Sequence, residues 1–161
     1  LVAMLSDTGM RLAEAAGLAI SDLHLDAEIP FVRLSEHRWR RLKTKGSERD
    51  IPLIGASLWA ANRVVKDCTN EFAFPRYCSA ESCKADYASN TLNKWLRRYV
   101  PEGCVVHSFR HSMRDRLRAV QCPSDMIDQI GGWHSAHVGE SYGMGYPLSV
   151  IVKYLNDGVT K

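Results

Sequence analysis

The chain has 161 residues, of which 45% are hydrophobic and 24% are charged, and its formal net charge is +3. This length and balance predict one compact domain over residues 1–161 and exclude disordered, collagen-like and coiled-coil proteins. No apolar run approaches the roughly 20 residues of a membrane helix and no signal-peptide pattern opens the chain, so we expect a cytoplasmic protein without a membrane partner. Its five dispersed cysteines indicate reduced thiols rather than a disulfide framework.

The charge is unevenly distributed along the chain. Residues 33–49 hold seven basic and two acidic residues, and residues 94–118 hold the same numbers, so each segment carries +5. The rest of the chain therefore carries −7. Such segments are either solvated faces or binding surfaces for a polyanion such as nucleic acid, and charge alone leaves both open.

The N-terminal part predicts two short helices. An apolar run over residues 1–6 is broken at residues 7–9, Asp-Thr-Gly, which offer a cap for a second helix over residues 10–16. Gly17 is placed to end that helix. Because the chain starts inside a helical pattern and without an initiator Met, we expect a fragment of a longer protein.

A small antiparallel sheet is predicted to follow. Polar and apolar residues alternate in four short stretches, at residues 22–25, 31–34, 40–43 and 49–53. The last two stretches are separated by a Lys-Gly-Ser-Glu sequence, which predicts a tight hairpin between them.

The remainder of the chain predicts helices. Helical spacing of apolar residues recurs at residues 56–66, 87–100, 108–121, 124–130, 136–142 and 148–156. Proline and glycine residues separate these stretches. The expected fold class is mainly α with a small antiparallel β-sheet (α+β).

The segment His-Ser-Phe-Arg-His at 107–111 opens one of these helices and could bind a phosphate. Ser108 is a plausible N-cap and Arg110 lies in the first turn, where free backbone N–H groups and a forked guanidinium can bind anionic oxygens together. Arg114 and Arg118 continue the stripe that Arg110 begins at intervals of four. The ordinary alternative is a surface helix whose arginines are solvated.

Three further segments hold residues that could take part in chemistry, although each has an ordinary structural explanation. Arg11 and Glu14 share a helix face at a spacing of three, which is usually a structural pair. Lys43 and Lys45 lie at the predicted hairpin, where lysines are common. Tyr142 precedes a glycine-rich stretch and could be an exposed nucleophile if nearby cations lower its pKa, although most such tyrosines pack in or beside a core.

These segments together resemble the catalytic domain of the tyrosine recombinases, the phage integrase family. The matching features come in order: Thr-Gly-Met-Arg-Leu-Ala-Glu at 8–14, a hairpin lysine, the segment 107–111, a Gly-Trp pair ending at Trp133, and Tyr142 nine positions later. Each feature alone is weak, and the specificity lies in their combination. The resemblance implies a site-specific recombinase or integrase that cleaves and rejoins double-stranded DNA without metal, ATP or cofactor.

Site roles follow from this resemblance residue by residue. Arg11 and Arg110 would clamp the non-bridging oxygens of the scissile phosphate, and His107 would hydrogen-bond to the same group. Tyr142 would attack phosphorus to form a 3′-phosphotyrosyl link and release a 5′-hydroxyl, which Lys45 would protonate. The positive side chains can stabilise the charge that gathers in the transition state.

Several positions have alternatives. Trp133 stands where the family has His or Trp, and the adjacent His134 could supply an imidazole instead. Lys43 is an alternative to Lys45, and His111 is a supporting or alternative residue on the same helix as His107. Glu14 would orient the site, and Tyr146, at 13 positions from Trp133, lies too far along the chain to be the preferred nucleophile.

The resemblance also implies partners. Other protomers of the same chain would join it on DNA in a tetrameric synapse. The protein would be bacterial or phage-encoded and associated with the nucleoid. We expect the N-terminal DNA-binding domain of the family to lie outside this chain, which we expect to be a fragment. The apolar helix at 148–156 would dock on a neighbouring protomer or fold back on its own core. The rival hypotheses are a non-catalytic helical DNA-binding module and, with less support, a metal site that includes His107 and His111.

Overall fold

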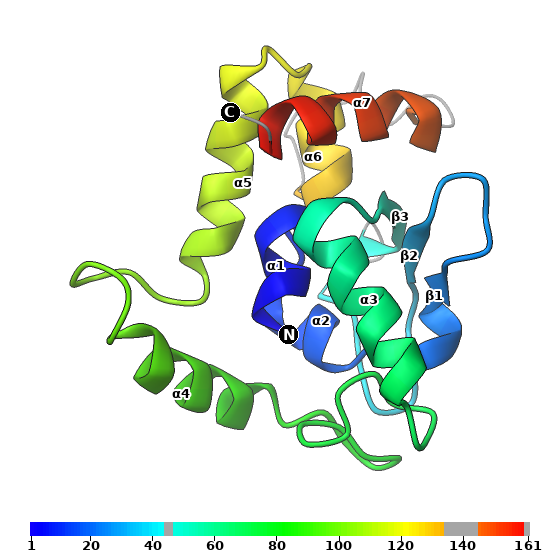
Figure 1. The fold of residues 1–161 in the computed structure, drawn as a ribbon, viewed down its shortest axis with the longest axis vertical. Coiled ribbons are helices and arrows are strands. Elements are labelled where there is room, and N and C mark those ends of the chain that lie inside the picture. The colour runs from blue at the N-terminus through cyan, green and yellow to red at the C-terminus, as the bar shows by residue number, and fades with distance from the viewer. Residues whose placement is uncertain (44–46, 134–144, 160–161) are drawn as a thin grey trace.

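The computed structural model describes residues 1–43, 47–133 and 145–159. Seven α-helices are described in these ranges, with one 3₁₀ turn and a three-stranded sheet (Figure 1). The elements are α1 (Val2–Thr8), α2 (Leu12–Ala16), η1 (Ile20–Asp22), β1 (Leu23–His24), β2 (Phe31–Leu34), β3 (Arg49–Pro52), α3 (Gly55–Asp67), α4 (Ala85–Leu96), α5 (Ser108–Ala119), α6 (Ser124–Gly131) and α7 (Leu148–Val159). The predicted α+β class is confirmed.

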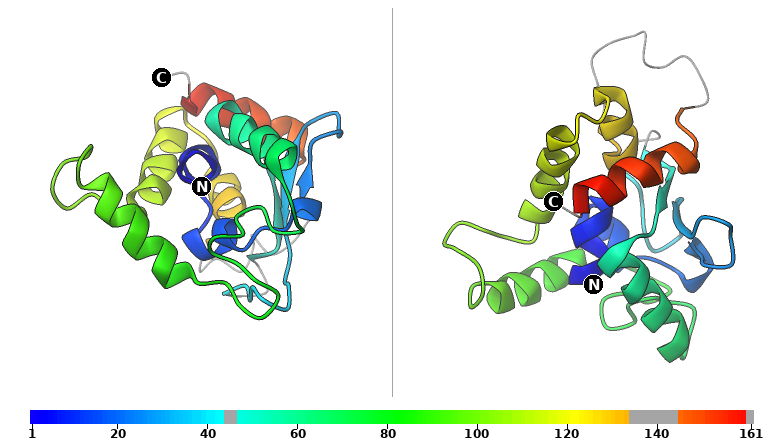
Figure 2. Two further views of the ribbon diagram at one scale, coloured as in Figure 1. Left: turned by 60° about the horizontal axis from the view of Figure 1, so that its bottom comes forward. Right: turned by 45° about the horizontal axis from the view of Figure 1, so that its top comes forward.

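Helix α1 lies at the centre of the molecule. It packs on α3 and α5, and a view along its axis shows the other helices arranged around it (Figure 2). Its apolar residues Met4 and Leu5 are fully buried, in one core with Met113 and Leu117 of α5. Helix α4 and the segment after it project from this body (Figure 2).

The break between α1 and α2 differs in detail from the prediction. Helix α1 runs on through Asp7 and Thr8 and ends at Gly9, whose φ of 63° is the left-handed conformation that glycine adopts most readily. Asp7 does not cap α2. Its carboxylate accepts hydrogen bonds from the backbone N–H groups of Ala56 (2.8 Å) and Ser57 (3.4 Å) and so caps α3 instead.

The sheet has the order β1-β2-β3 with antiparallel pairing, and β2 pairs directly with β3, Leu34 opposite Arg49. The prediction of a strand at 40–43 that forms a tight hairpin with 49–53 is therefore wrong. Arg40 makes only an isolated bridge with His37. Its guanidinium turns inward to Asp22 Oδ2 (3.3 Å) and to the backbone oxygens of Glu14 and Ser35.

The helices after the sheet agree with the predicted spacing. Helices α3 and α6 match to within one residue at each end, whereas α4 and α5 end earlier than predicted and α7 ends later. Ser108 is the first residue of α5 and His107 is its N-cap, one position before the predicted cap. The helix predicted at 136–142 lies outside the described residues.

Helix α7 packs on the core of its own chain. Ile151 and Leu155 are fully buried, and the helix contacts α5 and β3. Of the two alternatives for this segment, the structure shows the one in which it folds back. Within the described ranges, no helix combines the length and the apolar character that a bilayer crossing requires.

Candidate active site

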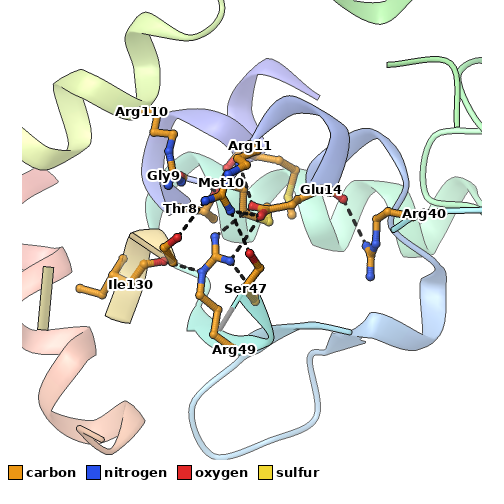
Figure 3. A network of polar contacts seen from close by, with 12 residues as sticks. Thr8, Gly9, Met10, Arg11, Glu14, Arg40, Ser47, Arg49, Arg110 and Ile130 are labelled. Atoms are coloured by element: carbon orange, nitrogen blue, oxygen red, sulfur yellow. Dashed lines mark hydrogen bonds and ion pairs between the residues drawn. The ribbon is translucent and has the colours of Figure 1, made fainter. Parts of the chain in front are cut away.

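Four predicted site residues of the described ranges come together near the start of α2. They are contributed by the α1–α2 turn, the start of α5 and the turn after α6, and hydrogen bonds that join the first of these segments to the other two span 101 and 121 positions of sequence. Figure 3 shows how Arg11, Glu14 and Arg110 gather around that turn, with Arg49 of β3 and the nearby Ser47 below them. The residues brought together are Arg11, His107, Arg110 and Trp133.

Arg11 is the N-cap residue of α2 and is held from two sides. Its Nη1 donates to Glu14 Oε1 at 2.5 Å, and its Nη2 donates to the backbone oxygen of Gly132 at 2.8 Å. The backbone N–H of Arg11 also donates to Glu14 Oε2 at 2.8 Å. The guanidinium is therefore fixed in direction while it remains partly exposed.

Glu14 is buried between two arginines. Burial alone would raise the pKa of its carboxyl, but the charge of Arg49 and hydrogen bonds from Arg49 and Arg11 outweigh burial, so the net pKa is lowered. The carboxylate is the anionic centre of the cluster, and it supports the predicted orienting role of this residue.

Arg110 is buried in the first turn of α5. Its Nη1 donates to the backbone oxygen of Gly9, and its Nη2 is buried without a hydrogen-bond partner among the described residues. Burial, followed by the positive charge of nearby Arg11, lowers its pKa to about 10. A buried donor without a partner beside a second guanidinium is a site where an anion would be favoured. The alternative of a solvated arginine is wrong for Arg110.

Trp133 covers the Arg110 side chain. The Arg110 guanidinium carbon lies 4.1 Å from the centre of the indole ring, and that of Arg114 lies 5.0 Å away, both in cation–π geometry. The ring folds back over Gly131, where a Cβ atom would lie 1.8 Å from it. The Gly-Gly-Trp sequence thus lets the indole reach the arginines.

His107 is exposed at the start of α5, next to the two arginines. Although much of the residue is open to solvent, partial desolvation of its ring lowers its pKa, and the charges of His111, Arg110 and Arg11 lower it further. His111 contacts His107 edge-on, with ring centres 4.9 Å apart. In the described part of the chain, no group of three or more His, Cys, Asp or Glu side chains is able to hold a metal ion.

Three predicted site residues, Lys45, His134 and Tyr142, lie outside the described residues. The choices between Lys43 and Lys45 and between Trp133 and His134 therefore remain predictions. Lys43 is described and is exposed.

Tyr146, the second tyrosine near Trp133 in sequence, is hydrogen-bonded within the molecule. Its hydroxyl donates to Asp125 Oδ2 at 2.8 Å, and this hydrogen bond raises its pKa. A phenol with a raised pKa is a poorer nucleophile at neutral pH.

Arg49 was not predicted as a site residue. The sequence indicated only that it belongs to the basic segment 33–49. Arg49 is buried and forms an ion pair with Glu14 at 3.0 Å. The alternation of β3 carries a signal for this, because Arg49 shares a strand face with Ile51 and Leu53, both core residues.

Much of the charge in the two basic segments is paired within the molecule. Arg33 pairs with Asp50, Arg40 with Asp22, Arg114 with Asp128 and Arg116 with Asp7. Neither alternative from the sequence, a solvated face or a polyanion surface, holds for the buried Arg40 and Arg49. The exposed cations of these segments include Arg38, Arg41, Lys43, Lys94, Arg97 and Arg98.

Comparisons with known proteins give a family from the sequence and a shared fold from solved structures. A sequence profile described as the phage integrase family matches residues 1–143. The Tn1549 transposon integrase in complex with a circular intermediate DNA has a TM-score of 0.67 at 18% identity, covering 95% of this chain and 52% of that chain. The same integrase with transposon right end DNA gives 0.64 at 19% identity, covering 99% and 58%. XerA recombinase gives 0.55 at 18% identity, covering 96% and 55%.

The chain spans about half the length of the first of these structures (52%). At these identities the likeness concerns the fold, which is the α+β fold that the sequence predicted. No match was found among functionally curated proteins.

Proposed function

Because the chain belongs to the phage integrase family, we propose that residues 1–161 form the catalytic domain of a tyrosine-type site-specific DNA recombinase. Its substrate is double-stranded DNA, and the solved Tn1549 integrase structures contain circular intermediate DNA or transposon right end DNA. The longer protein would carry a separate DNA-binding domain. Four protomers would assemble on DNA, and the enzyme would work in the cytoplasm, at the nucleoid.

The observation that carries this proposal is the pairing of Arg11 with Arg110. Two guanidiniums share one site, where the charge of Arg11 helps to lower the pKa of Arg110, and Arg110 Nη2 has no partner among the described residues. A phosphate diester placed between them would give that donor an acceptor and relieve the repulsion. His107 at the start of α5 can donate to the same phosphate.

In the proposed reaction, Tyr142 gives up its phenolic proton to solvent and the resulting phenolate oxygen attacks the scissile phosphorus. The bond from phosphorus to the 5′-oxygen breaks, a 3′-phosphotyrosyl link forms, and Lys45 gives a proton to the departing oxygen. The negative charge that develops on the non-bridging oxygens is stabilised by Arg11, Arg110 and His107, so this proposal requires neither metal nor ATP. A second 5′-hydroxyl then reverses the step on another strand.

Trp133 and Glu14 support these groups in the proposal. Trp133 packs on Arg110 and keeps water from one face of its guanidinium. Glu14 holds Arg11. His134 and Lys43 are the alternatives to Trp133 and Lys45, and His111 supports His107.

The test is covalent capture by a nicked suicide duplex, from which the cleaved strand segment diffuses away. Full-length protein is incubated with such duplexes drawn from the DNA that flanks its gene, and adducts are separated on a denaturing gel. We expect an adduct with the wild-type protein and none with Tyr142→Phe. A protein that binds these duplexes but never forms an adduct would support the rival non-catalytic DNA-binding module.

A further inference from the structure

Arg49 contacts three separate segments of the candidate site. Its Nε donates to the backbone oxygen of Ile130 at 2.8 Å, and its Nη1 donates to that of Ser47 at 2.7 Å. Its Nη2 donates to Glu14 Oε2 at 3.0 Å (Figure 3). With its side chain only 4% exposed, Arg49 lies beneath the site rather than in it.

A second observation places Arg49 against the turn that follows α6. Gly132 has a φ of 61°, and a Cβ built on it would lie 2.7 Å from Arg49 Nη1. Because Gly132 has no side chain, its backbone can contact the Arg49 guanidinium directly. The backbone oxygen of Gly132 is also an acceptor for Arg11 Nη2.

Besides a longer hydrogen bond to Ser47 Oγ (3.4 Å), the Arg11 guanidinium is held by Glu14 and Gly132, and Arg49 contacts both of these residues. We propose that Arg49 is a positioning residue, which fixes these two acceptors and so directs Arg11 toward the scissile phosphate. A lysine could not replace it, because three contacts in different directions need the planar fork of a guanidinium. This inference rests on the proposed function.

The test compares cleavage of two nicked duplexes in single turnover. One carries the ordinary scissile phosphodiester and the other carries a methylphosphonate, in which a neutral methyl group replaces one charged oxygen. Because the neutral group leaves less charge for Arg11 to stabilise, a defect that acts through Arg11 shrinks on the methylphosphonate. A general loss of folded enzyme slows both substrates equally.

We expect Arg49→Lys to cleave the phosphodiester roughly 100-fold more slowly, the effect of a displacement of about 1 Å. Its defect on the methylphosphonate should be several-fold smaller, and Arg11→Ala should show the same pattern. Arg33→Lys is the matched control, because Arg33 also pairs across this sheet, with Asp50, but is 54% exposed. It should match the wild type on both substrates.

Gly132→Ala provides a second probe, since it keeps Arg49 but places a Cβ atom against its guanidinium, in a backbone whose φ of 61° also disfavours alanine. It serves in place of Arg49→Lys if that protein does not fold, and it should show the same substrate dependence. Equal losses on the two substrates in a folded variant, or a wild-type rate in Arg49→Lys, would overturn the positioning role. If the wild-type protein forms no adduct with either duplex, the proposed function itself fails, and this inference fails with it.

A second, independent feature is a pair of cysteines, Cys78 and Cys83, which lie in the segment between α3 and α4. Cys78 and Cys83 face each other in an antiparallel bridge, flanked by hydrogen bonds from Ser79 N to Ser82 O (3.0 Å) and from Lys84 N to Tyr77 O (2.7 Å). This is the non-hydrogen-bonded kind of pair, whose Cα atoms lie about 4.5 Å apart, within the range that a disulfide spans. Both thiols are free, and burial raises the pKa of each, to about 12 for Cys78.

We infer that Cys78 and Cys83 form an oxidation site that closes to an intramolecular disulfide. The oxidant is a low-molecular-weight disulfide such as oxidised glutathione. The thiolate of half-buried Cys83 attacks one of its sulfurs and releases one small thiol. The thiolate of buried Cys78 then attacks the Cys83 sulfur and releases the second, so two protein thiols are oxidised and one external disulfide is reduced.

Equilibration of the folded protein with mixtures of oxidised and reduced glutathione tests this site. Intact-mass measurement after thiol alkylation should show a form that has lost two hydrogens and two alkylation sites. Cys78→Ser and Cys83→Ser should prevent it, whereas the matched control Cys104→Ser should not. Accumulation of only a glutathione adduct on Cys83, or a disulfide to another cysteine, would contradict the inference.

Discussion

The two arginines of the candidate site are held by different forces. Arg11 is fixed by a carboxylate, in the ion pair with Glu14, and Arg110 is fixed by the carbonyl of Gly9 and the indole of Trp133. Arg110 therefore keeps one buried donor free of any partner among the described residues. An incoming phosphate oxygen would be the acceptor for that donor.

Replacement of Arg110 by lysine should abolish most strand cleavage, because lysine lacks the planar fork that presents one nitrogen to the Gly9 oxygen and another to a phosphate. We expect a loss of roughly 100- to 1,000-fold in the single-turnover rate, the usual effect of removing one preorganised donor. Arg118→Lys, on the same helix but paired with Asp115 at the surface, is the matched control and should stay within about 3-fold of the wild type. A wild-type rate in Arg110→Lys would remove this residue from the site.

Glu14 should make stability depend on pH. Since its folded pKa lies below the usual value of 4.5, the carboxylate stabilises the fold above that value, and this contribution is lost as the pH falls through the folded pKa. In thermal unfolding, Glu14→Gln should be less stable than the wild type at pH 7, and the gap should narrow below about pH 4.5. The exposed Glu102→Gln should show little difference throughout. A gap that stays constant down to pH 3 would contradict the buried ion pairs.

The sequence predicted candidate site residues where they belong to a recognisable motif. It did not predict residues outside such motifs. Arg11 and Arg110 were singled out by ordered motifs, and the structure brings them together. Arg49 was missed because a count of basic residues treats a buried guanidinium and a solvated one alike. The alternation of Arg49 with Ile51 and Leu53 in the stretch 49–53 did indicate that its side chain faces the core.

Secondary structure was predictable where a segment has a strong period. Helices α3 and α6 were placed to within one residue because their apolar residues recur at helical spacing. The strand expected at 40–43 failed because alternation cannot reveal which strand is the partner. Here β2 takes the position beside β3, and the buried ion pair of Arg40 with Asp22 draws its segment away from the sheet.

Helix α7 should contribute strongly to the stability of the single chain, because Leu155 is completely buried against the core. Leu155→Ala should lower the free energy of unfolding by about 2–5 kcal/mol, the usual cost of truncating a buried leucine. Lys153→Ala, on the exposed side of the same helix, should change it by less than about 0.5 kcal/mol. Urea denaturation of the protein without DNA distinguishes these outcomes. Equal, small effects would show that α7 does not pack on its own chain in solution.

The site is a property of the whole molecule, since its contacts join residues far apart in the chain. Arg110 and Gly9 are 101 positions apart, and Arg11 and Gly132 are 121 apart. Helical and strand periods are local, so they could not predict these contacts. Only the resemblance of the ordered motifs to a known family predicted that the segments meet.

The net charge of +3 is likewise a sum over the whole chain, and it does not show which cations lie on the surface. Within each basic segment, some cations form internal ion pairs, with Glu14, Asp22, Asp7 and Asp128 among their partners, and others remain exposed. The exposed ones are the groups available to DNA phosphates in the proposed complex. Charge counted along the sequence could not separate the two kinds.

The most direct measurement of the proposed chemistry is the identity of the residue that becomes linked to DNA. After capture with the nicked duplex, the adduct is digested with protease and nuclease, and the modified peptide is sequenced by mass spectrometry. The account predicts a single modified residue, Tyr142, carrying a nucleotide through its 3′-phosphate. Modification of Tyr146 or of any other residue would contradict it.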